Sequence, residues 1–317
     1  MGVNVQAQTS VSTTPVGFVS TELPASGFTY LGVSLTIPPA LTSSTTTLED
    51  DAVDVGIDLT ALDVNKAYAM EIADGTHEGY TADIDSWTGQ IITLTEDIEA
   101  GGIDPIDFDG SRVCIRELPT IDSIFGADNS AGLKAGTLAT ADTIYLYGAG
   151  GFTRHYYFPG GFGLDPGWRD EDGDYSGSTI LHFGDGLVIN TSDTETKEIV
   201  ISGSVKLGPT NVPLYEGFNL VSNPSPVEGR LTLANSGIKE GLKVGTAATA
   251  DVVYIPSSSG GFDKYYYFPG GFGLDPGWRN VDTGVYSNDT PLPDAGSFFI
   301  DRQSGPSSVM IAEDLPN

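Results

Sequence analysis

The first residues of the chain alternate between polar side chains and apolar or β-branched ones. One face of this pattern carries Val3, Val5, Ala7, Thr9, Val11 and Thr13. Strict alternation over this length is typical of a half-buried β-strand, because successive strand side chains point to opposite faces. Pro15 interrupts the pattern, as expected where a strand leaves its sheet. The sequence therefore predicts an extended arm, residues 1–15, that pairs with an open sheet edge, either its own or that of a second copy.

Short apolar runs bounded by turn residues continue through the rest of the chain. Ala67–Ile72, Gly79–Ile84 and Gly89–Leu94 are predicted strands, and Asp85–Thr88 is the predicted hairpin connection between the last two. Helix is predicted to be scarce. The exceptions are two short helical turns, at Leu118–Phe125 and Leu233–Ile238.

The chain contains an internal repeat. Tyr156–Arg169 recurs without change as Tyr266–Arg279, and Gly132–Thr137 recurs with one substitution as Gly241–Thr246. The second copy is continuous, whereas the first is interrupted after Pro39, which indicates an inserted unit.

These observations predict the domain organisation and the fold class. We expect an N-terminal arm at 1–15, a first β repeat at 16–40 and 117–207, an inserted β domain at 41–116, and a second β repeat at 208–317. The predicted class is all-β, with tandem duplicated β-sandwich or barrel-like domains, an inserted small β domain and an extended N-terminal strand.

The charge and composition of the chain exclude several kinds of partner and site. The chain has 43 acidic and 14 basic residues, for a formal net charge of −29. Such a surface repels phosphate backbones and anionic lipids, so we expect neither nucleic-acid binding nor peripheral membrane binding. No run of 18 apolar residues is present, so no helical membrane span is expected. A single cysteine, Cys114, excludes an intramolecular disulfide and a multi-cysteine metal site.

Several segments of the chain occur in a characteristic order. These are Pro15–Val19, Gly217–Pro224, and an Asp-x-x-Tyr, Gly-Phe-x-x-Tyr-Tyr-Tyr and Gly-Trp-Arg succession. In this order the chain resembles uncharacterised exported proteins with duplicated β-domains from Verrucomicrobia-type bacteria. The resemblance covers most of the chain. It implies export and a β-rich fold, and it implies no activity.

Acidic side chains form one candidate metal site. Its candidate calcium ligands are Asp165, Asp170, Asp172 and Asp174. Oxygen ligands at alternate positions around a glycine turn are typical of calcium loops. Leu181 stands where an EF-hand loop would supply its bidentate Glu, and a solvated acidic turn remains the alternative.

The repeated segment supplies a cluster of aromatic side chains. Its members are Tyr156, Phe158, Phe162, Trp168, Tyr266, Phe268, Phe272 and Trp278. Such rings either stack on sugars or form the core of each repeat, and the exact repetition fits both interpretations.

No nucleophile elbow, P-loop or dinucleotide fingerprint is present, so we expect no enzymatic activity. A hydrolase built from scattered carboxylates stays a weaker alternative. The segment Val5–Ala7 looks like the end of a trimmed or replaced export signal, with a cytosolic protein carrying a polar tail as the alternative.

The sequence therefore favours a secreted or cell-surface structural protein. We expect it to polymerise head-to-tail with copies of itself through the arm, in a filament or surface layer. We expect its assembly to depend on salt or calcium, because divalent cations bridge acidic subunits. A secreted glycan-binding or adhesive surface module is the alternative.

Overall fold

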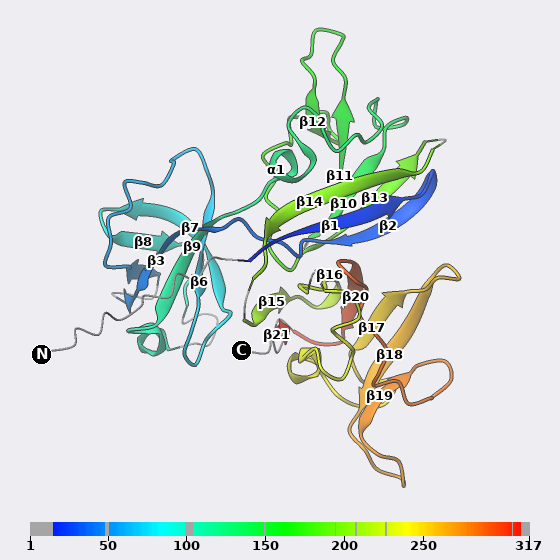
Figure 1. The fold of residues 1–317 in the computed structure, drawn as a ribbon. Coiled ribbons are helices and arrows are strands. Elements are labelled where there is room, and N and C mark those ends of the chain that lie inside the picture. Colours follow the sequence, from blue (N-terminus) through cyan, green and yellow to red (C-terminus); the bar gives the residue numbers. More distant parts are fainter. Residues whose placement is uncertain are drawn as a thin grey trace, which may run out of the picture.

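The computed structural model describes residues 15–47, 51–98, 104–148, 150–193, 195–206, 208–225, 227–305 and 307–311 (Figure 1). Within these ranges the protein is nearly all β, which confirms the predicted class. The strands are antiparallel and form five sheets. Residues 1–14, with the arm side chains Val3, Val5, Ala7, Thr9, Val11 and Thr13, lie outside the described residues.

The first repeat has two layers. Its five-stranded sheet has the order β12-β11-β10-β13-β2 and is covered by a two-stranded ribbon, β1-β14. The two layers share one core, to which β1 contributes Leu23, β14 contributes Ile199 and β12 contributes Trp168. The strands are β1 (Val16–Leu23), β2 (Ser26–Gly32), β10 (Thr143–Gly148), β11 (Gly151–Phe158), β12 (Gly167–Asp170), β13 (Gly186–Ser192) and β14 (Lys197–Ser204).

The second repeat has a sheet of the same size with the order β16-β20-β17-β18-β19, and the ribbon β15-β21. Each strand occupies the place of its counterpart in the first repeat, since β16 corresponds to β2 and β19 to β12. Trp278 and Ile300 lie in its core. The strands are β15 (Thr210–Leu214), β16 (Gly217–Ser222), β17 (Val252–Pro256), β18 (Phe262–Phe268), β19 (Gly277–Asn280), β20 (Ser297–Arg302) and β21 (Ser307–Ile311).

A separate seven-stranded sheet with its own core stands beside the repeats, at the left of Figure 1. Its order is β3-β9-β6-β7-β8-β5-β4. The strands are β3 (Pro39–Ser44), β4 (Thr46–Thr47), β5 (Ala52–Asp54), β6 (Tyr68–Ile72), β7 (Thr81–Thr88), β8 (Ile91–Leu94) and β9 (Arg112–Glu117), and the 3₁₀ helix η2 (Pro105–Phe108) precedes β9. The domain boundaries given above stay predictions.

The predicted hairpin connection is wrong in position. Residues Asp85–Thr88 belong to β7, where a register shift near Ile84 lets the strand continue and Trp87 packs edge-on against Tyr68. The turn falls instead at Gly89, which has a positive φ of 64°.

The two predicted helical turns have different outcomes. Within Leu118–Phe125 the structure has α1 (Ile121–Phe125), whose first turn is closed by a reciprocal capping box between Thr120 and Ser123. Residues 233–237 form turns and not a helix, because Gly237 has a left-handed φ of 78°. The 3₁₀ helix η3 (Ile238–Gly241) begins only after this glycine.

The two repeats contact each other through aromatic side chains and small residues. The ring of Phe299 lies within 6.4 Å, between centroids, of the rings of Tyr30, Tyr147, Phe152, Phe218 and Phe262. A Cβ added to Gly32 would lie 2.7 Å from Cβ of Ser222, and one added to Gly186 would lie 2.6 Å from Cβ of Ser297. The contact is therefore tight, and it fixes one repeat against the other.

Candidate functional site

The aromatic cluster divides into core and surface. Tyr156, Phe158, Trp168, Phe268 and Trp278 are buried, and Tyr266 is half-buried. Trp168 is 0% exposed and donates a 2.8 Å hydrogen bond from its ring nitrogen to the carbonyl of Gly126. The buried rings belong to the interior of their own repeat. They offer no platform for a sugar.

Phe162 and Phe272 differ from the other members of the cluster, because they are 98% and 100% exposed. Each sits at the apex of a hairpin, Gly161–Leu164 or Gly271–Leu274, which we call the hairpin tips. Both phenylalanines have a positive φ of 55°, followed by a glycine that is also left-handed. Two successive positive φ values define a type I′ turn, in which a bulky side chain is unfavourable.

The hairpin tips are fixed at their base. In the first repeat, Gly161 and Leu164 exchange two backbone hydrogen bonds of 3.0 Å. The guanidinium of Arg169 donates to the carbonyl of Asp165 at 2.9 Å and lies 5.4 Å from the ring centre of Phe158. Arg279 makes the corresponding contacts in the second repeat. Figure 1 shows the two loops, next to β12 and β19, projecting toward opposite ends of the molecule.

One of the candidate calcium residues, Asp170, serves as a turn cap. The Asp170 carboxylate accepts hydrogen bonds from the backbone N–H groups of Asp172 and Asp174, at 3.0 and 2.9 Å. In the second repeat the amide of Asn280 accepts equivalent bonds, so the turn needs an oxygen and not a charge. Asp165 contributes its carbonyl to Arg169. Among the described residues, no three His, Cys, Asp or Glu side chains are placed to hold a metal ion.

A cluster of charges joins the first repeat to the seven-stranded sheet, and sequence reasoning missed it. Nε2 of His182 lies 2.9 Å from Oδ2 of Asp83 on β7, and Asp185 approaches its other ring nitrogen at 3.5 Å. The hydrogen bonds with Asp185 and Asp83 raise the pKa of His182 to about 10. Nearby, the buried carboxylate of Glu71 pairs with both Arg116 and Lys206. No motif marks these residues, because the partners are far apart in sequence.

A cleft of about 470 Å³ lies where the three units meet. Its walls include Tyr147, Phe183, Tyr215 and Phe218, and no Lys or Arg side chain lines it. His182, Asp83 and Asp185 of the charge cluster also line this cleft.

The ribbon β1-β14 leaves one edge of β14 uncovered. Val205 donates a backbone hydrogen bond to Pro15 on the β1 side, at 2.9 Å. Ser204 exchanges backbone hydrogen bonds of 2.9 and 2.7 Å with Thr36 on the other side. Because successive strand amides point to opposite edges, those of Glu198, Val200 and Ser202 point to the same side as that of Ser204. We call these three residues the open edge.

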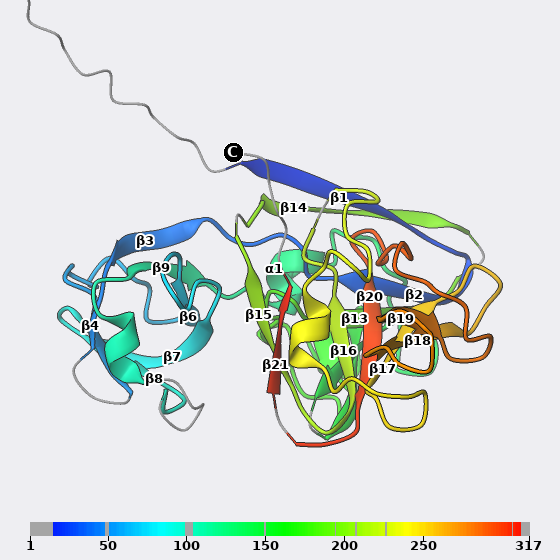
Figure 2. The same cartoon turned by 90° about the horizontal axis from the view of Figure 1, so that it is seen from below.

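In the described part of the chain, no strand pairs with the open edge beyond the single bridge at Ser204. Figure 2 shows the β1-β14 ribbon lying along one side of the two repeats. Val200 is itself exposed. An uncovered strand edge of this length is a ready template for pairing with another chain.

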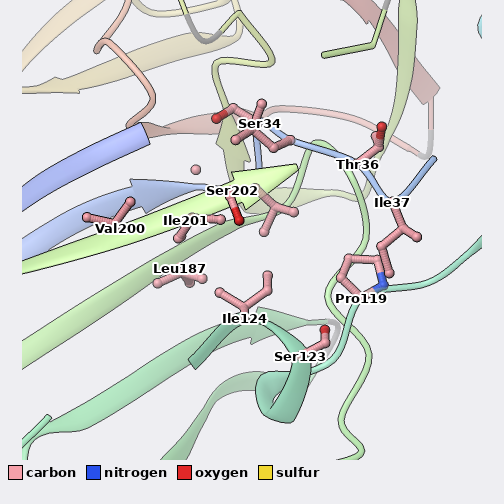
Figure 3. Close-up of a pocket in the computed structure, with 13 residues that line it drawn as sticks. Ser34, Thr36, Ile37, Pro119, Ser123, Ile124, Leu187, Val200, Ile201 and Ser202 are labelled. Carbon is pink, nitrogen blue, oxygen red and sulfur yellow. The ribbon is translucent and has the colours of Figure 1, made fainter. Parts of the chain in front are cut away.

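A groove of about 170 Å³, lined by apolar and hydroxyl side chains, runs beside the open edge between β14 and α1 (Figure 3). Ile124 of α1, Leu187 of β13 and Ile201 of β14 converge on it, and Pro119 and Ile37 close one end. Leu187 is buried, whereas Ile124 and Ile201 are only partly covered. We call this feature the β14 groove. It lies where a third strand of the ribbon would lie.

The same place in the second repeat is filled. There η3 packs against β21, and a Cβ added to Gly241 would overlap the backbone carbonyl oxygen of Ser308. The two repeats thus share a strand order and differ at this edge.

Comparison with known proteins returns no match to any family model, and no significant match to a curated protein or a solved structure. Within the described residues, no helix is both long and apolar enough to cross a membrane.

Proposed function

We propose that this protein is an extracellular structural subunit that assembles into a filament or surface layer, with its N-terminal arm as an added β-strand. The observation that carries the proposal is the open edge of β14 beside the β14 groove, on which Ile124, Leu187 and Ile201 converge. Backbone hydrogen bonds along such an edge supply affinity, and pockets for alternate side chains supply specificity.

The arm has the pattern that such an edge requires. Its Val3, Val5, Ala7 and Val11 lie on one face, and the residues between them are polar. A strand of this kind buries its apolar face in a groove and leaves its polar face in water. The net charge of −29 supports the proposal too, because it keeps subunits apart until a specific contact forms.

Deletion of residues 1–14 tests the proposal. We expect the shortened chain to remain folded and monomeric, as measured by circular dichroism and sedimentation velocity, while the full chain forms polymers visible by negative-stain electron microscopy. A full-length variant with Val3, Val5 and Val11 replaced by serine should behave like the deletion.

The matched control replaces the other face of the arm, with Asn4, Gln6 and Gln8 changed to alanine, and should still assemble. Polymers that persist after deletion of the arm would contradict the proposal, as would a full chain that stays monomeric at every concentration.

The hairpin tips favour a second candidate, an adhesive or glycan-binding module. A fully exposed Phe162 held in an unfavourable backbone conformation, and repeated as Phe272, has no role in the core of either repeat. Aromatic rings at exposed positions are suited to contacts with sugars or with apolar protein surfaces. Loss of adhesion or glycan binding in variants of these two residues, with the fold intact, tests this candidate.

A further inference from the structure

We infer that the β14 groove is the single acceptor site of the subunit, and that its occupant is the arm of a second copy of this chain. This inference rests on the proposed function. It adds the partner, the stoichiometry and the polarity of the assembly. One arm and one acceptor per subunit give a head-to-tail contact that does not close on itself, and such a contact builds an open fibre.

The backbone at the root of the arm argues against pairing within one molecule. The hydrogen bond from Val205 to Pro15 holds the end of the arm on the β1 side of the ribbon. To reach the open edge, the arm of the same chain must cross the end of β14, where Thr36 is bonded to Ser204. The arm of the same chain would then run parallel to β14, because it ends at Pro15 beside Val205, at the end of that strand. Parallel pairing is slightly less stable per residue, and an arm from a second copy is free to pair antiparallel.

The length of the open edge and the small volume of the groove suit the arm. From Glu198 to Ser202 the open edge is five residues long, about 17 Å, whereas 14 extended residues reach roughly 45 Å. The arm therefore covers the edge with residues to spare. Its apolar side chains are valine and alanine, which are small enough to enter a groove of about 170 Å³ that is lined in part by Ile124, Leu187 and Ile201.

Several other sheet margins offer less. The outer strands β12 and β19 have four residues each, and β4 has two. The outer edge of β1 has eight residues and is also unpaired among the described residues, so the choice of β14 rests on the β14 groove. The margin at β3 begins with Pro39 and carries a register shift. In the second repeat, η3 covers the counterpart of the β14 groove. The first repeat therefore supplies the acceptor.

β14 pairs with β1 on one side and is proposed to accept the arm on the other. A single substitution at the open edge changes only the second pairing. In Val200→Pro the lost N–H points away from β1, so the β1-β14 ladder keeps its hydrogen bonds while the incoming strand loses a donor. We expect this variant to be folded and monomeric. Val200→Thr keeps the N–H and the strand preference, and should assemble like the parent chain. Ile124→Glu, which places a charge in the β14 groove from α1, provides an independent block.

Mixing two non-assembling chains tests the polarity. The chain without residues 1–14 keeps its acceptor, and the Val200→Pro chain keeps its arm. We expect each alone to sediment as a monomer and the mixture to form a one-to-one dimer that grows no further.

Each outcome decides a different point. If Val200→Pro and Ile124→Glu both polymerise while the arm deletion does not, the acceptor is elsewhere and the inference fails, although the proposed function stands. A mixture that forms no dimer, or that forms long polymers, overturns the single acceptor. Polymers without any arm overturn the proposed function itself.

Discussion

The two repeats preserve one feature and differ in another. The segment from Tyr156 to Arg169 is identical to that from Tyr266 to Arg279, and both copies form the same strained hairpin with a φ of 55° at the apex. The ribbon edges have diverged. β14 borders an open groove, whereas β21 is covered by η3. Identical sequence therefore gives an identical tip, while a 3₁₀ helix decides which repeat can accept a partner.

The largest expected effect concerns the tryptophans that the repeats share. Trp168→Ala and Trp278→Ala should each destabilise their repeat by about 3–5 kcal/mol, because each removes a fully buried ring. Replacement of each tryptophan by phenylalanine should affect the stability of the two repeats differently. The N–H of Trp168 donates to Gly126, whereas no partner is found for that of Trp278 among the described residues.

We therefore expect Trp168→Phe to cost about 1 kcal/mol more than Trp278→Phe in urea denaturation. Equal costs for the two substitutions would show that the hydrogen bond to Gly126 adds nothing to stability.

A smaller effect is expected at His182, whose place in the second repeat is occupied by Pro293. Hydrogen bonds that the ring of His182 donates to Asp185 and Asp83 raise its pKa to about 10, above its ordinary value of 6.5. A raised folded-state pKa gives stability that is fully present below pH 6.5 and is lost as the pH rises toward 10. Because the side chain is 45% exposed, the gain should stay within about 1 kcal/mol.

Urea melts at pH 6, 8 and 10 measure this loss. The His182→Leu variant, which removes both ring nitrogens, should show a weaker dependence over the same range. An unchanged slope in that variant would assign the pH dependence to other groups.

The smallest effect, and the only gain, is expected at the hairpin tips. Phe162→Asn and Phe272→Asn should each stabilise the protein by roughly 0.5–1 kcal/mol, since asparagine tolerates a left-handed backbone better than phenylalanine does. Thermal denaturation measures the gain. If adhesion or glycan binding is lost at the same time, the rings of Phe162 and Phe272 take part in that binding. A loss of stability instead would show that the rings support the fold.

The sequence allowed the all-β class to be predicted, because alternation and turn residues are local signals. It did not reveal the contact between the repeats, where Phe299 and Gly32 matter through neighbours more than 70 residues away. It placed the Asp85–Thr88 turn too early, since only the pairing with β8 sets the register. The predicted calcium ligands proved to include a turn cap at Asp170, because acidic side chains serve both purposes equally well.

The sequence predicted the arm that is proposed to be added, but not the edge that is proposed to accept it. The arm pattern indicates a strand that requires an edge, and it leaves open which edge. The open edge became visible only when the direction of each amide of β14 was known. Ile199 and Val200 are equally apolar in sequence, yet one faces the core and the other is exposed.

Hydrogen exchange resolved to single amides in β14 tests the central claim most directly. In the chain without residues 1–14, the amides of Ile199 and Ile201, which bond to β1, should be protected, while those of Glu198, Val200 and Ser202 exchange freely. In the assembled full-length protein all five should be protected. If the three amides of the open edge exchange as fast in the polymer as in the arm-less monomer, no strand is added there and the account is wrong.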